Sequence, residues 1–263
     1  MKQGNPIGWR FARGNAKLSG MVHAFPALCT AAGAIGASAT FAWGSVAPSA
    51  QLFGPTIRRT GDPSTIALTF DDGPNPSATP ALLDLLDRHR VQATFFLIGA
   101  WVREQPACAK DIAARGHALG NHTDSHPALT VLSGRRISEE LGRCDDSIES
   151  ATAQKPRWVR PPFGYRSPVL DRIVRRRGAA GVVMWSVSAR DWKVQRAEQV
   201  IERLRPARGG DIVLLHDGDH RMMNSDRRHT VAALEYWLPR WKDSGIRFVT
   251  LDQVQQHVQS GKI

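Results

Sequence analysis

Acidic and histidine side chains gather at two points of the sequence, each directly after a short apolar run. Asp71 and Asp72 follow one run, and His122 and His126 follow another. Two imidazoles and one carboxylate make a plausible Zn²⁺ site that keeps a position open for water. The two histidines are four residues apart, so they can face one ion if their segment turns helically. We therefore expect one divalent ion here, Zn²⁺ or another.

Other readings of these donors remain open. Two histidines and one carboxylate also form the iron site of non-haem oxygenases, and histidines in a loop often bind no metal. The second aspartate and a separate histidine, His216, favour water activation over oxygen chemistry. A hydrolytic metal centre is the interpretation that uses all of these side chains.

The polar side chains also suggest a division of roles. Asp71 and Asp72 share one turn and point in different directions, so one can bind the ion while the other accepts a proton from water. Arg160, which is permanently charged, would keep that base ionised. His216 would protonate a leaving amine, and an anionic neighbour such as Asp191 would keep His216 charged.

The elements that must position these side chains alternate along the chain. Short apolar runs predict strands, and amphipathic stretches predict helices between them, one of them beginning at Ser138. The predicted strands are Thr65–Phe70, Ala93–Ile98, His117–Asn121, Trp158–Arg160, Gly181–Trp185, Asp211–Leu215 and Phe248–Leu251. The predicted helices are Pro80–Arg90, Pro106–Arg115, Ser138–Thr152, Pro168–Arg177, Ala197–Arg205 and Val231–Asp243.

This alternation favours the α/β class, with about seven parallel strands in a distorted, incomplete (β/α) barrel. An open doubly wound sheet competes, but no glycine-rich dinucleotide turn follows the first strand. Five polar clusters follow predicted strands, and the carboxyl ends of parallel strands are where barrel enzymes assemble their sites. Any one cluster could be a plain turn or loop. Packing alone does not explain five polar clusters at the ends of predicted strands.

These clusters carry a family resemblance. From about Thr65 to Leu251 the chain resembles the polysaccharide deacetylases with a NodB-type homology domain, carbohydrate esterase family 4. The matching motifs are Thr69–Pro74, His122–His126, Arg160–Phe163, Arg190–Trp192 and Ile212–His216. The resemblance implies a distorted (β/α) barrel and a metal-dependent hydrolase that removes N-acetyl groups from a cell-wall-type polysaccharide, either peptidoglycan or a chitin-like polymer.

The resemblance also implies a role for each matching position. It makes Asp71 the base, steadied by Arg160, and it makes the metal ligands Asp72, His122 and His126. His216 would be the acid, tuned by Asp191.

Three further positions would contact the substrate. The backbone N–H of Phe163 would help hold the oxyanion, and Trp192 and Leu214 would wall the acetyl pocket. The family more often has Tyr where this chain has Phe163. A main-chain donor is unaffected by that change, although the contacts with the sugar can differ.

Two other functions compete with this hypothesis. A catalytically silent, carbohydrate-binding version of the fold would be expected to have a broken motif, and none is broken here. A hydrolase of a small amide would keep the chemistry, but an export segment disfavours a cytoplasmic substrate. No protein partner can be inferred from the sequence.

Charge is concentrated at the N-terminus. The net charge is +11, yet residues 1–61 hold six basic and no acidic side chains. The rest is too balanced to predict nucleic-acid binding. We interpret 1–20 as a basic cytoplasmic-side region, 21–44 as a signal-peptide core or membrane anchor, 45–61 as a linker and 62–263 as the deacetylase domain.

The N-terminal pattern therefore predicts an exported protein of the periplasm or cell envelope, in contact with the membrane through residues 21–44. A disordered tail is the alternative for this stretch. In an exported chain Cys108 and Cys144 could form a disulfide or remain two reduced, buried thiols.

Overall fold

A computed structural model describes residue 36 and residues 38–254. The chain divides into two compact units, Met1–Ala42 and Trp43–Ile263. In the first unit, residues 36 and 38–42 are helical. The predicted basic region 1–20 and most of the predicted segment 21–44 lie outside the described residues. Within residues 36 and 38–254, no helix is both long and apolar enough to cross a membrane.

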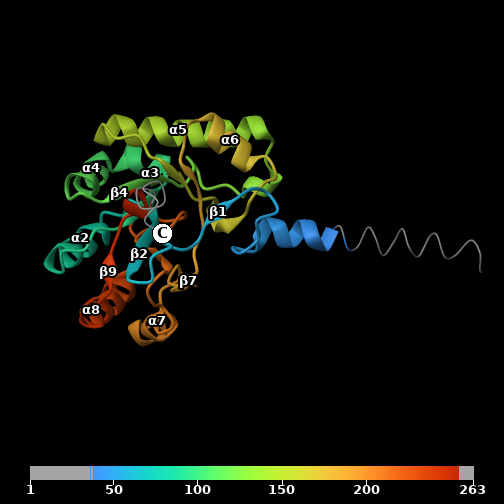
Figure 1. The fold of residues 1–263 in the computed structure, drawn as a ribbon. Coiled ribbons are helices and arrows are strands. Elements are labelled where there is room, and N and C mark those ends of the chain that lie inside the picture. Colours follow the sequence, from blue (N-terminus) through green and yellow to red (C-terminus); the bar gives the residue numbers. More distant parts are fainter. Residues whose placement is uncertain (1–35, 37, 255–263) are drawn as a thin grey trace, which may run out of the picture. The chain divides into compact units, whose positions relative to one another are not determined.

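The second unit is built on one curled sheet of parallel strands, surrounded by helices (Figure 1). The strands are β1 (Thr56–Ile57), β2 (Thr65–Gly73), β3 (Thr94–Leu97), β4 (Ala118–Asn121), β5 (Trp158–Val159), β6 (Gly181–Val183), β7 (Val187–Ser188), β8 (Ile212–His216) and β9 (Arg247–Phe248). Their order is β1-β6-β5-β4-β3-β2-β8-β7, and β9 pairs with the start of β2. Each neighbouring pair in this order is parallel, so the fold is the predicted incomplete (β/α) barrel.

Strand β2 is the centre of this sheet. All nine of its residues are buried, because helices cover one of its faces and the barrel interior covers the other. It pairs with β8 from Ala67 to Asp71 and with β3 from Thr69 onward. The strand is longer than predicted and includes Asp71 and Asp72, which we expected to follow it. A β-bulge between Asp71 and Gly73 shifts the register there, and such bulges re-aim side chains.

Six helices form a ring around the strands in the order α7-α8-α2-α4-α5-α6. They are α2 (Thr79–Arg88), α4 (Pro106–Ala114), α5 (Gly134–Thr152), α6 (Leu170–Arg176), α7 (Ala197–Leu204) and α8 (Arg228–Asp243). A short helix, α3 (Gly99–Glu104), packs against α5. The main core fills the space between β2, β3, β8 and these helices, and includes Phe70, Phe95, Leu215, Leu234 and Trp241.

Some predicted boundaries were wrong. Helix α5 begins at Gly134, four residues before the predicted Ser138, because Ser133 caps it by accepting a bond from the Arg136 N–H at 3.3 Å. The last strand was predicted over Phe248–Leu251, but β9 contains only Arg247 and Phe248. Residues 251–254 are helical. The sequence did not predict β1, β7 or α3, since two-residue strands and a six-residue helix are too short to show periodicity.

Residues 45–61, the predicted linker, contact the domain. Strand β1 pairs with β6, and Arg59 forms an ion pair with Asp211 at 2.9 Å. The buried guanidinium of Arg166 donates to the backbone carbonyls of Gly44, Ala47 and Ala50 at 2.5 to 2.9 Å. Cys108 and Cys144 are both free thiols, so the pairing that we left open does not occur in this structure.

Candidate active site

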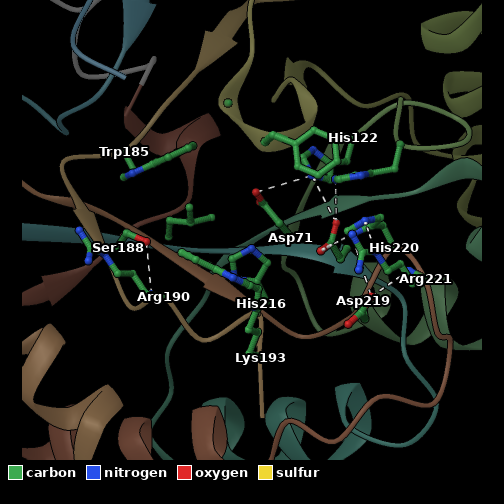
Figure 2. A pocket seen from close by; sticks show the side chains of 16 residues that line it. Asp71, His122, Trp185, Ser188, Arg190, Lys193, His216, Asp219, His220 and Arg221 are labelled. Atoms are coloured by element: carbon green, nitrogen blue, oxygen red, sulfur yellow. Dashed lines mark hydrogen bonds and ion pairs between the residues drawn. The ribbon is translucent and has the colours of Figure 1, made fainter. Parts of the chain in front are cut away.

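One cavity of about 590 Å³ opens at the carboxyl ends of the strands (Figure 2). Its walls come from β2, β7, β8 and the loops that follow β4, β5, β6, β7 and β8. The lining residues are Asp71, Asp72, His122, His126, Phe163, Gly164, Trp185, Ser188, Arg190, Trp192, Lys193, Leu214, His216, Asp219, His220 and Arg221. Eight of the ten predicted site residues line this cavity. Arg160 and Asp191 are fully buried and contact Asp71 and His216 from behind.

Asp72, His122 and His126 lie close enough to ligate one ion, as their residue types predict. The Asp72 Oδ1 is 3.5 Å from the His122 Nε2 and 3.1 Å from the His126 Nε2. Neighbouring ligands of a tetrahedral Zn²⁺ lie roughly 3.3 Å apart, since each bond is about 2.0–2.1 Å long. The segment 122–126 is not the helical turn that we expected. It turns through left-handed residues, Thr123 (φ 68°) and His126 (φ 57°).

The tautomer of His122 indicates that this trio fits a cation. The His122 Nδ1 donates to the Arg160 carbonyl at 2.8 Å, because a carbonyl can only accept. In the neutral ring the Nε2 therefore carries a lone pair, and it faces the Asp72 carboxylate. The Asp72 Oδ1 is buried and has no hydrogen-bond donor among the residues described. Two acceptors held face to face are stable only with a cation between them or with an added proton.

Asp71 lies beside the trio and is bonded to Arg160, and its Oδ2 is 3.8 Å from the His122 Nε2. The Arg160 Nη1 donates to the Asp71 Oδ1 at 2.7 Å and to the Thr69 hydroxyl at 2.8 Å. The remaining donors of this buried guanidinium reach the backbone carbonyls of Val183 and Met184. Its plane lies 4.2 Å from the centre of the Phe96 ring. The two aspartates therefore have different partners, Arg160 for Asp71 and His126 for Asp72.

His216 and Asp191 form a second buried pair. The His216 Nδ1 is 2.8 Å from the Asp191 Oδ1, and the His216 backbone N–H donates to the other carboxylate oxygen at 3.0 Å. Burial alone would lower the pKa of His216, but the attraction of Asp191 raises it to about 9. His216 is therefore a cation at neutral pH, with its Nε2–H available to the cavity.

Two residues of α8 hold Asp191 in place. The Thr230 hydroxyl donates to the Asp191 Oδ2 at 2.7 Å, and the His229 Nε2 donates to the Asp191 carbonyl at 2.9 Å. Neither residue was predicted from the sequence. Both lie almost forty positions away from Asp191 in a helix whose apolar pattern predicts packing only.

Left-handed backbone conformations concentrate around the cavity. Of the seven non-glycine residues with positive φ in the described chain, five belong to the predicted motifs: Asp72, Thr123, His126, Phe163 and Arg190. Such conformations cost about 1–3 kcal/mol each and persist where the surrounding structure imposes them. Their concentration here indicates that the fold stabilises this arrangement of side chains at some cost in stability.

The three predicted substrate contacts are at the cavity wall. Phe163 is half-exposed, and its ring lies edge-on against His126 with centroids 4.6 Å apart. The Trp192 ring is also half-exposed and lies 5.9 Å from the His216 ring. Leu214 is buried in β8 and gives the floor of the cavity an apolar patch.

One side chain beside the metal-ligand trio was missed. His220 stacks on His126 with ring centroids 4.3 Å apart, and its Nδ1 lies 3.9 Å from the Asp72 Oδ2. His220 follows His216 by four residues, which is the spacing of His122 and His126. This spacing could have identified His220 as a site residue from the sequence.

Asp217, which follows His216 in the predicted cluster, does not face the cavity. It accepts from the Thr79 hydroxyl at 2.5 Å, and burial raises its pKa to about 7. Its carboxylate packs against Gly73, where no side chain would fit.

Comparison with known proteins agrees with this geometry. The family model for polysaccharide deacetylase matches residues 58–182. The chain is 37% identical over 194 residues to a peptidoglycan-N-acetylglucosamine deacetylase of Bacillus cereus, covering 73% of this chain and 88% of that protein. It is 38% identical over 203 residues to a chitooligosaccharide deacetylase of Sinorhizobium fredii, covering 74% and 93% of the two chains.

Similarity of structure extends to a relative that is not an enzyme. A carbohydrate esterase family 4 pseudoenzyme from Bacillus anthracis superimposes with a TM-score of 0.68 at 31% identity, covering 76% of this chain and 68% of that one. The fold alone therefore does not distinguish active members of the family from silent ones. The side chains of the site have to make that distinction. With its curled parallel sheet and the polar cavity at the strand ends, this chain belongs to the polysaccharide deacetylase family.

Proposed function

We propose that this protein is a metal-dependent N-deacetylase that hydrolyses acetamido groups of an amino-sugar polysaccharide and releases acetate. The observation that carries the proposal is the convergence, in one cavity, of a buried Asp-His-His trio with two separate acid–base pairs. Relatives that deacetylate peptidoglycan and chitooligosaccharides support the class of substrate. The ion, Zn²⁺ or another divalent metal, would be held by Asp72, His122 and His126.

Each remaining side chain has a place in the reaction. When bound, a divalent ion polarises an amide carbonyl and acidifies water. Asp71, held in place by its bond to Arg160, accepts a proton from the attacking water, whose oxygen bonds to the acetyl carbon. The Phe163 backbone N–H donates to the oxyanion that forms.

The cationic His216 then gives its Nε2 proton to the sugar nitrogen as the carbon–nitrogen bond breaks. Asp191 holds the imidazole in orientation and stabilises its charge. Trp192 and Leu214 enclose the acetyl methyl group. The products are acetate and a free amine, so one water is consumed for each acetyl group removed.

The N-terminal segment places this activity outside the cytoplasm in our proposal. Residues 1–44 would act as an export signal or anchor, and the domain would work on a glycan of the cell envelope. One relative named above acts on peptidoglycan, a glycan of the cell envelope, which agrees with that location.

The silent, carbohydrate-binding alternative makes a different prediction. A binding module needs the cavity walls but has no use for a base, an acid and three oriented ligands. All of these side chains are present in one cavity, with Asp71 bonded to Arg160 and His216 to Asp191, which favours catalysis.

Acetate release tests the proposal. Purified protein should release acetate from peptidoglycan or chitin oligomers, and a chelator should stop the release until a divalent metal is added back. Binding of the glycan without acetate release, at any metal loading, would instead support the silent alternative.

A further inference from the structure

Three exposed cations line the mouth of the cavity outside the reacting side chains. Arg190 and Lys193 lie in the loop after β7, and Arg221 lies in the loop after β8. None of the three forms an ion pair with a carboxylate of residues 38–254, although most arginines of this domain do. The side chain of Arg221 has one hydrogen bond, to the ring of His220 at 3.3 Å.

Most other charges of the cavity already have partners. Asp71 is paired with Arg160, and His216 with Asp191. Asp72 belongs to the Asp-His-His trio, and Asp219, the remaining carboxylate among the lining residues, receives the guanidinium of Arg227 at 3.3 Å. Even with Asp72 counted, the three cations leave the mouth an excess of positive charge within the described residues.

The cations lie on two sides of the reacting centre. Figure 2 shows Arg190 beside Ser188 on one side of His216, and Arg221 beside His220 and Asp219 on the other. Lys193 lies below His216 in the same view. A ligand that pairs with the cations on both sides must carry two negative charges. One charge would lie on each side of the group that reaches His216.

Resting on the proposed deacetylase function, we propose that the substrate is a glycan whose reacting acetamido sugar has carboxylate-bearing sugars as neighbours. Arg190, Lys193 and Arg221 would select it over a neutral amino-sugar polymer. Exposed ion pairs are individually weak, so each should favour the anionic glycan by about threefold at most, and the three together by roughly tenfold. The contribution is to binding and appears in KM, because these side chains do not touch the amide.

Matched probes isolate the carboxylate. The first is a tetrasaccharide of alternating N-acetylglucosamine and N-acetylmuramic acid, the second is its methyl ester, and the third is chitotetraose. The wild-type protein should turn over the free acid with roughly tenfold higher kcat/KM than the ester. The gap should narrow in 1 M salt, where the screening length falls to about 3 Å.

Variants assign the preference to these cations. Lys193→Gln and Arg221→Gln combined, both outside the five matching motifs, should raise KM for the free acid and so narrow the difference in kcat/KM between the free acid and the ester. Lys110→Gln with Lys155→Gln removes exposed cations outside the cavity and is the control for net charge. Equal kcat/KM for acid and ester in the wild type, or the same loss in the control, would overturn the inference.

Binding separates this inference from the proposed function. Calorimetry of the Asp71→Asn variant compares the Kd of the free acid with that of the ester without any turnover. Tighter binding of the acid supports the inference even if the wild type releases no acetate, which would count against deacetylation alone. Equal Kd values refute the inference even if deacetylation is confirmed.

Discussion

At the scale of single residues, the two neighbouring aspartates offer the clearest division of roles. Asp71→Asn should lower kcat by about two to four orders of magnitude, the usual contribution of a positioned base, while metal content stays near that of the wild type. Asp72→Asn should instead lose the metal, because it removes the charged ligand of the trio. Elemental analysis and acetate release measure both effects.

The reverse pattern would exchange the two roles. Metal lost from Asp71→Asn and kept in Asp72→Asn would show that the ligand and the base had been assigned the wrong way round. Wild-type rates in both variants would place the chemistry elsewhere.

The His216–Asp191 pair makes the rate depend on pH. The raised pKa of His216, about 9, means that the acid is protonated at neutral pH and is lost as the pH rises through that value. The kcat/KM should therefore fall above about pH 9. In Asp191→Asn the largest attraction is gone and burial remains, so the fall in kcat/KM should move to lower pH.

The pH profiles need one control. Asp84→Asn removes an exposed carboxylate of α2. The kcat/KM of this variant should still fall above about pH 9. If kcat/KM of Asp191→Asn fell at the same pH as that of the wild type, another group would donate the proton.

The sequence identified most of the site at this scale because residue type limits chemistry. Five polar clusters at the ends of predicted strands pointed to one shared site, and all ten predicted residues line the cavity or support it. Thr230 and His229 could not be found in this way. Their function depends on where α8 packs, which a local pattern does not encode.

At the scale of elements, the close approach of β2 and the loop after β8 limits which residues can stand there. A Cβ on Gly218 would lie 1.9 Å from the Asp72 carbonyl oxygen, a contact that only backbone movement can relieve. Gly218→Ala should therefore displace the ligand strand, lowering metal affinity and activity together. Metal titration and circular dichroism check this.

Gly134→Ala is the matched control, because its nearest contact would be an ordinary 3.6 Å. It should bind metal normally and gain slightly in helix stability. Full metal binding by Gly218→Ala would show that the two strand ends can separate without loss of the site.

Strands were predicted well where they are long and buried on both faces, as β2, β3 and β8 are. The start of α5 was missed for a physical reason. Ser133 and Ser138 are equally good caps in isolation, and the apolar contacts of Ile137 with β5 and α6 residues decide between them.

At the scale of the whole molecule, Arg166 ties residues 44–50 to the domain. Arg166→Met should leave the carbonyls of Gly44, Ala47 and Ala50 without this donor, and each orphaned buried acceptor costs about 1–3 kcal/mol. We expect a lower Tm and cleavage by proteases near residues 44–52. Arg172→Met, which removes an exposed arginine of α6, should change neither. An unchanged Tm in Arg166→Met would show that solvent replaces the lost donors.

Export is a second property of the whole chain. Residues 1–60 fused to a reporter that is active only outside the cytoplasm should give signal, because a basic start precedes a long uncharged stretch. A stable, soluble fusion without signal would contradict our placement of the enzyme.

The pairing of β2 with β8 determines when the protein can first act. Thr69 and its bonding partner Val213 lie 144 positions apart, so the ribosome must synthesise four-fifths of the chain before the two strands can meet. Contacts so distant in sequence form slowly, because a large loop must close first. Until then the base and the acid are on separate, unpaired segments. A chain whose synthesis has not reached β8 therefore lacks the assembled cavity, and any activity of the cavity must begin after the two strands have paired.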